Sequence, residues 1–113
     1  MSSLKLHMMK EVRVITQGEY VNYVTDLLDN VHATGYTMIH NISGKGRHGV
    51  HTSHLMFNEV SSLVMIMTVV PEEKVEPILA GMKPIFDRYP GALFVSDVAV
   101  SRPEHFSVSA GEK

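Results

Sequence analysis

Cysteine is absent from the 113 residues, which excludes a disulfide framework, a thiolate metal site and a cysteine nucleophile. No apolar run approaches the roughly 20 residues that cross a bilayer, and the N-terminal stretch lacks the long apolar core of a signal peptide. The formal net charge is −2, so the chain has no overall basic field to attract nucleic acid or an anionic membrane. We therefore expect a soluble, cytoplasmic protein that neither binds nucleic acid nor inserts into a membrane.

Motifs of common catalytic sites are also missing. The sequence has no G-x-x-x-x-G-K-[ST] phosphate loop, no serine elbow and no HExxH metal site. Asp97 lies inside a predicted strand as a single carboxylate without an evident partner. We predict that the protein is not an enzyme.

The elements that are present alternate between strand and helix patterns. Strands are predicted at residues 12–16, 37–42, 63–70 and 94–100 from alternating or continuous apolar residues. Apolar residues at intervals of three and four predict helices over residues 19–33, closed by Gly35, and over the stretch after Pro71. In this second helix the stripe comprises Val75, Ile78, Leu79, Met82, Ile85 and Phe86, and we expect a start near Pro77 or a bend near Pro84.

This order is β-α-β-loop-β-α-β, which predicts a single α+β domain over residues 1–113 with the ferredoxin-like βαββαβ fold. Right-handed crossovers would place both helices on one face of a four-stranded antiparallel sheet. The strands are apolar at both sets of alternating positions, so the other face would be uncovered unless subunits associate through it. We expect an oligomer, and a short polar tail over residues 103–113.

A polar loop after the second strand carries most of the candidate chemistry. Glycines at 44, 46 and 49 allow backbone N–H groups to turn toward an anion, and Lys45 and Arg47 add positive charge. Arg47 could bind phosphate or bicarbonate in a bidentate manner. On the residues alone, a solvated turn is the commoner interpretation of such a loop.

Several segments in order resemble the PII superfamily of nucleotide-sensing signal proteins, and in particular its PII-like members linked to carboxysomes and bicarbonate uptake. They are "GYT" before the second strand, "GKGR" with a following histidine, "VVPEEKVEPIL" after the third strand, and "PGALFVSDVAV" near the end. The resemblance covers about residues 10–100. It implies a homotrimer whose intersubunit clefts bind adenine nucleotide, and a flexible T-loop, here residues 45–62, that docks onto a target protein.

The resemblance also implies which residues form the cleft. Ile15 and Thr16 would lie under the base, and the remaining positions come from the two walls and the C-terminal region: Thr37, Gly44, Lys45, Gly46, Arg47, Tyr89, Pro90, Gly91, Ala92 and Arg102. Lys45, Gly46 and Arg47 would also contact bicarbonate. The target would be a bicarbonate transporter or a carboxysome component.

Four departures from the family pattern affect these expectations. Ala92 stands where the family has a phosphate-binding lysine, and the arginines near the C-terminus are largely missing, so we expect ADP or AMP to bind better than ATP, although ATP remains possible. One extra residue between Thr37 and Gly44 predicts a bulge or a displaced loop base. No tyrosine lies between residues 43 and 62, which argues against regulation by uridylylation.

The loop histidines leave an alternative open. His48, His51 and His54 are spaced by three and could bind zinc, nickel or copper, in which case the protein would be a metal-responsive regulator of a metal-efflux system. In a loop without fixed geometry, such histidines are more often surface hydrogen-bonding groups. The main prediction therefore includes no metal site.

Overall fold

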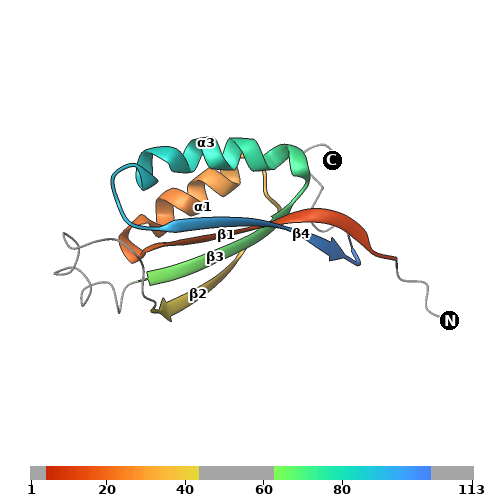
Figure 1. The fold of residues 1–113 in the computed structure, drawn as a ribbon, viewed down its shortest axis with the longest axis horizontal. Coiled ribbons are helices and arrows are strands. Elements are labelled where there is room, and N and C mark those ends of the chain that lie inside the picture. Colours follow the sequence, from red (N-terminus) through yellow and green to blue (C-terminus); the bar gives the residue numbers. More distant parts are fainter. Residues whose placement is uncertain (1–4, 44–62, 103–113) are drawn as a thin grey trace.

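The computed structural model describes residues 5–43 and 63–102. It contains β1 (His7–Gln17), the short 3-10 turn η1 (Gly18–Tyr20), α1 (Val21–Asn30), β2 (Thr37–Ile42), β3 (Leu63–Val70), the 3-10 turn η3 (Glu72–Lys74), α3 (Val75–Phe86) and β4 (Ala92–Val100). The strands form one antiparallel sheet in the order β2-β3-β1-β4. Both helices lie on the same face of this sheet (Figure 1). The predicted α+β, ferredoxin-like βαββαβ fold is confirmed.

The core lies between the helices and one face of the sheet. Burial alternates strictly along β3, where Val64, Ile66, Thr68 and Val70 are buried and their neighbours are half-buried. Val12 and Val14 of β1 continue this layer, and α1 contributes Val24 and Leu28 to it. A strand with period two and helices with apolar stripes thus bury their matching faces against each other.

Strand bounds agree with the sequence for β2 and β3 and differ for β1 and β4. β2 and β3 span the predicted residues 37–42 and 63–70. β1 begins at His7 and β4 at Ala92, earlier than the apolar patterns indicated. The residues by which these strands exceed the prediction include polar ones, which an apolar pattern does not detect. They belong to the strands through backbone pairing between β1 and β4, which runs from His7↔Val100 to Ile15↔Ala92.

The end of α1 corrects the prediction that Gly35 closes this helix. The left-handed residue is His32, with φ of 63°. The N–H of His32 donates to the carbonyl of Asp29 at 3.0 Å, and the N–H of Ala33 donates to that of Leu28 at 2.9 Å, which together form a Schellman motif. Histidine is one of the residues that tolerates this conformation outside glycine, so the helix ends before Gly35 is reached.

The second helix begins slightly earlier than expected and passes through both prolines. Pro77 lies in the first turn of α3, where its missing N–H has no intrahelical partner to lose. Pro84 lies inside the helix, which continues to Phe86. Ile78, Met82 and Ile85 are buried as predicted, whereas Leu79 is exposed, because α3 packs on the sheet through a narrower stripe than the sequence indicated.

The predicted bulge is present near the end of β2. Pairing with β3 shifts between His40, opposite Val64, and Ile42, opposite Leu63. Asn41 is the extra residue and has φ of 60°, a left-handed conformation that asparagine adopts at low cost. The bulge lies shortly before the segment 44–62, which is outside the described residues together with 103–113, so the predictions for the loop and tail are not addressed by the structure.

Candidate functional site

The sheet face opposite the helices has regular cross-strand rows. Because paired residues of neighbouring strands share a face, the register defines one row of Thr37, Met67, Arg13 and Phe94 and a second row of Ile39, Met65, Ile15 and Ala92. Phe94 is 49% exposed and Ile39 is 43% exposed. An apolar face of this width on a sheet without helix cover is typical of a surface that another chain covers.

Arg13 lies in the middle of this apolar face. Its guanidinium carbon is 5.8 Å from the centre of the Phe94 ring, within the range of a cation–π contact. Its Nε is buried and has no hydrogen-bond partner among the described residues. A buried donor without a partner costs free energy, so this guanidinium is suited to an acceptor brought by another molecule.

The turn of residues 89–92 connects α3 to β4 and packs closely on the end of β1. The N–H of Tyr89 donates to the carbonyl of Ile85 at 2.9 Å, which fixes the start of the turn. A methyl group at Gly91 would lie 2.5 Å from Cε1 of Phe86 and 2.8 Å from the carbonyl oxygen of Ile15. Glycine is therefore required for this approach, and Ile15 is brought directly beside the turn.

Two aromatic side chains support the same turn. The rings of Tyr20 and Tyr89 lie 4.6 Å apart between centroids, with an interplanar angle of 31°. Burial raises the pKa of the Tyr20 hydroxyl above its usual range, and hydrogen bonding with Tyr89 and Glu19 adds to this effect. The guanidinium carbon of Arg88 is 5.9 Å from the Tyr89 ring centre. The Tyr89 side chain is thus held in place by Arg88, which follows α3, and by Tyr20 of the η1 turn.

Thr16 has a different environment from Ile15, its neighbour in the predicted site. Its side chain points into the core with 0% exposure, and its Oγ1 has no hydrogen-bond partner among the described residues. Ile15 faces the opposite side of the sheet, in line with Met65 and Ala92. Any contact of Thr16 with a ligand in this arrangement would use its backbone.

The remaining described site residues lie far from the 89–92 turn. Thr37 is on β2 and Ala92 is on β4, at opposite edges of the sheet. Three strand spacings separate these two edges, which is a distance of roughly 14 Å. Arg102 follows the far end of β4, and the nine residues of this strand span roughly 26 Å. One small molecule cannot contact all of these residues of one chain, so a shared site would require two copies.

The other predicted ligand residues cannot be placed. Gly44, Lys45, Gly46 and Arg47, and the alternative metal ligands His48, His51 and His54, lie outside the described residues. Within residues 5–43 and 63–102, no group of three His, Cys, Asp or Glu side chains is arranged to hold a metal ion. Over the same residues, no helix is long and apolar enough to cross a membrane.

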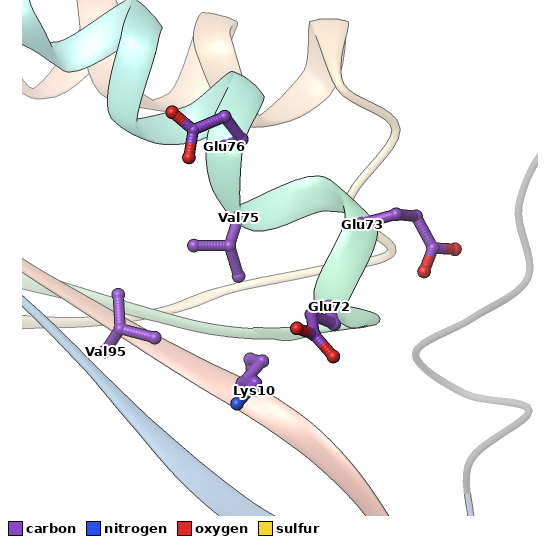
Figure 2. Close-up of a pocket in the computed structure, with 6 residues that line it drawn as sticks. All are labelled: Lys10, Glu72, Glu73, Val75, Glu76 and Val95. Carbon is purple, nitrogen blue, oxygen red and sulfur yellow. The ribbon is translucent and has the colours of Figure 1, made fainter.

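A hollow of about 630 Å³ lies at the other end of the sheet. Lys10 and Val95 line it from the strands, and Glu72, Glu73, Val75 and Glu76 line it from η3 and α3 (Figure 2). The Lys10 ammonium is paired with Asp97, and this hydrogen bond raises the pKa of Lys10. The carboxylates outnumber the single cation, so this hollow repels phosphate and is not a nucleotide site.

Comparison with known proteins decides the family. The model of the family described as "Nitrogen regulatory protein P-II" matches residues 9–105. The chain belongs to the P-II family. A comparison with the curated proteins gives no match.

Solved structures refine the place of the chain within the P-II family. CPII from Thiomonas intermedia K12, a nitrogen regulatory PII-like protein solved with ADP, AMP and bicarbonate, is 44% identical with a TM-score of 0.80, covering 94% of this chain and 100% of CPII. The apo form of CPII is 42% identical with a TM-score of 0.74, covering 89% and 100%. A PII-like signaling protein from Thermus thermophilus is 22% identical with a TM-score of 0.73, covering 91% and 99%, and it supports the fold alone. The chain is therefore a PII-like signalling protein.

Some supporting residues are not identifiable from the sequence. Tyr20 packs against the core, as its place in the apolar stripe of the first helix indicates, but its ring also stacks on Tyr89 from the η1 turn. The sequence pattern identifies Thr68 only as a strand residue, but the Oγ1 of Thr68 donates to the carbonyl of Gly35 at 2.6 Å. Neither contact leaves a signal in the sequence, because each joins residues more than 30 positions apart.

Proposed function

We propose that this PII-like protein binds adenine nucleotide, with ADP or AMP favoured over ATP, in the clefts of a homotrimer. In each cleft, the turn of residues 89–92 and Ile15 of one subunit would face Thr37 of a neighbour. The observation that carries this proposal is the similarity to CPII, which was solved with ADP, AMP and bicarbonate. The separation of the site residues within one chain supports a cleft between subunits.

The uncovered sheet face supports the trimer. Phe94 and Ile39 expose large apolar side chains there, and burying such surface stabilises association by about 25 cal/mol per Å². Arg13 and its unpartnered Nε lie in the same face, within the part of the chain that the structure describes. Association would bring this donor an acceptor from a neighbouring subunit.

The preference for ADP or AMP follows from the small number of cations. Ala92 brings no charge to the 89–92 turn, and Arg88 is the cation nearest to it in sequence. Each additional phosphate adds negative charge that needs a positive partner or backbone N–H groups. A site with few cations gains little from the third phosphate of ATP.

We further propose that bicarbonate binds at Lys45, Gly46 and Arg47 beside the nucleotide and orders residues 45–62, the T-loop. The ordered loop would dock onto a target in inorganic-carbon uptake or fixation, either a bicarbonate transporter or a carboxysome component. A ligand shifts the loop only by its differential affinity for the ordered state. Couplings of this kind are about 1–3 kcal/mol, so bicarbonate would tighten nucleotide binding about 5- to 150-fold.

Calorimetric titration of the full chain tests this function. ADP, AMP and ATP are titrated separately, each with bicarbonate and with an equal concentration of chloride as the ionic-strength control. The expected result is binding of ADP and AMP that bicarbonate tightens, with ATP weaker. Absence of binding by all three nucleotides would refute the nucleotide site, and equal affinities in bicarbonate and chloride would refute the coupling.

A further inference from the structure

The connection between α1 and β2 is held by two side chains from one neighbouring segment. The Nζ of Lys74 donates to the carbonyl of His32 at 2.8 Å, and the Oγ1 of Thr68 donates to the carbonyl of Gly35 at 2.6 Å. Lys74 belongs to η3 and Thr68 to β3, the strand that pairs with β2. The chain is thus fixed at both ends of its passage from the helix layer to the sheet.

The Thr68 contact determines how the chain enters β2. Thr68 points to the helix side of the sheet and is only 4% exposed, so the carbonyl of Gly35 must lie on that side. Two residues later, Thr37 pairs with Met67 on the opposite face. The hydroxyl of Thr68 therefore fixes the backbone just before Thr37, the first residue of β2, which lies on the uncovered face.

β2 is held by its pairing with β3 and by Met38, which packs against the core. It is an edge strand that pairs with β3 alone, and the bulge interrupts this pairing after residues 37–40. Gly35 itself has no atom within 4 Å of the position of an added Cβ among the described residues, so packing does not restrain it. The buried hydrogen bond from Thr68 to Gly35 therefore adds a restraint directly before this strand begins.

We propose that Thr68 is a positioning residue for ligand binding, which holds residues 35–37 at the place where they line the nucleotide cleft. This inference rests on the proposed function, because Thr37 contacts ligand only if that cleft is the binding site. Thr68 does not touch the ligand, since its side chain faces the core. Its effect is transmitted through the backbone of Gly35.

The test substitutes Thr68→Val, which keeps the shape of the side chain and removes the donor, and Thr68→Ser, which keeps the hydroxyl. AMP and ADP affinities are measured by calorimetry, and thermal unfolding is measured on the same samples. We expect Thr68→Val to weaken nucleotide binding about three- to tenfold, the range of one hydrogen bond, and Thr68→Ser to restore the affinity.

Tyr23→Phe is the matched control for a purely structural loss. The Tyr23 hydroxyl also donates to a backbone carbonyl at 2.6 Å, that of Gly81, but within the helix layer and away from residues 35–37. We expect this variant to lose thermal stability as Thr68→Val does while retaining wild-type affinity. Weakened binding in Thr68→Val and Tyr23→Phe alike would assign the effect to stability and overturn the proposal.

The remaining outcomes separate this inference from the proposed function. If wild type binds AMP and ADP and Thr68→Val binds them equally well, the positioning role is refuted and the function is retained. If Thr68→Ser fails to restore affinity, the hydroxyl is not the cause and the role is likewise refuted. If wild type binds neither nucleotide, the proposed function fails first, and the positioning role fails with it.

Discussion

Substituting Gly91→Ala should disrupt the packing of the 89–92 turn on β1. The added methyl would lie 2.5 Å from Cε1 of Phe86 and 2.8 Å from the carbonyl oxygen of Ile15. The Phe86 ring can move, but the Ile15 carbonyl belongs to the backbone of β1 at its pair with Ala92. One of the two strands or the turn must therefore shift.

Forced overpacking of this kind costs about 1–3 kcal/mol. In a domain of this size, each kcal/mol lowers the midpoint of thermal unfolding by about 4 °C. Differential scanning calorimetry measures the change, with all variants at one protein concentration because association adds a concentration-dependent stability. We also expect weaker AMP binding, since the displaced turn forms a wall of the proposed cleft.

Gly35→Ala is the control for the loss of a flexible glycine. An added methyl there meets no described atom within 4 Å, so only the unfolded state is affected and the substitution should be neutral or stabilising by about 0.4–1 kcal/mol. Gly81→Ala provides an intermediate case, because its methyl would meet the mobile end of the Leu27 side chain while alanine favours the helix. If Gly91→Ala unfolds at the same temperature as Gly35→Ala, the close packing of the turn on β1 is wrong.

Three further predictions use other parts of the structure. Thr16→Val removes a buried hydroxyl without a partner among the described residues and should stabilise the protein by about 1 kcal/mol; destabilisation on calorimetry would show that the hydroxyl is satisfied. The pKa of the Tyr20 hydroxyl is raised in the folded state. The contribution of this hydroxyl to folding stability is therefore complete below about pH 10, the ordinary pKa of tyrosine, and is lost as the pH rises through the folded-state pKa. An ultraviolet titration should accordingly show one late-ionising tyrosine that is missing in Tyr20→Phe, and an unchanged titration curve would contradict the stacked arrangement. Phe94→Glu places a charge in the uncovered sheet face and should reduce the mass measured by light scattering from that of the proposed trimer toward that of a monomer. Leu79→Glu, at an exposed position on α3, tests whether any added charge has this effect.

The sequence predicted the fold well where periodicity determines it. β2 and β3 have the predicted bounds because their patterns are bordered by turn residues and, for β3, by Pro71. The end of α1 was mispredicted because the left-handed position is filled by His32, while the nearby Gly35, the residue type that usually fills it, is not needed there. The exposure of Leu79 likewise depends on how α3 lies on the sheet, which the helical spacing alone does not specify.

The candidate site was less predictable for a geometric reason. The family resemblance implied that Ile15 lies under the base of the cleft, and the structure places Ile15 beside the 89–92 turn because β1 and β4 pair there. Sequence order could not indicate that Thr37 and Arg102 lie too far from this turn to share a ligand within one chain. Separation of this kind follows from the strand order β2-β3-β1-β4, which is a property of the whole chain.

The bulge at Asn41 preserves the phase of the strand that leads into the loop. Successive strand residues face opposite sides of a sheet, so one inserted residue reverses the side that every later residue would take. With the bulge, Ile42 pairs with Leu63 and shares the uncovered face with Ile39; if Asn41 instead paired as an ordinary strand residue, Ile42 would point toward the helices. Deleting Asn41 would therefore remove the bulge and place Ile42 directly after His40, still opposite Leu63 and on the same face, so the bulge accommodates the extra residue without reversing the strand.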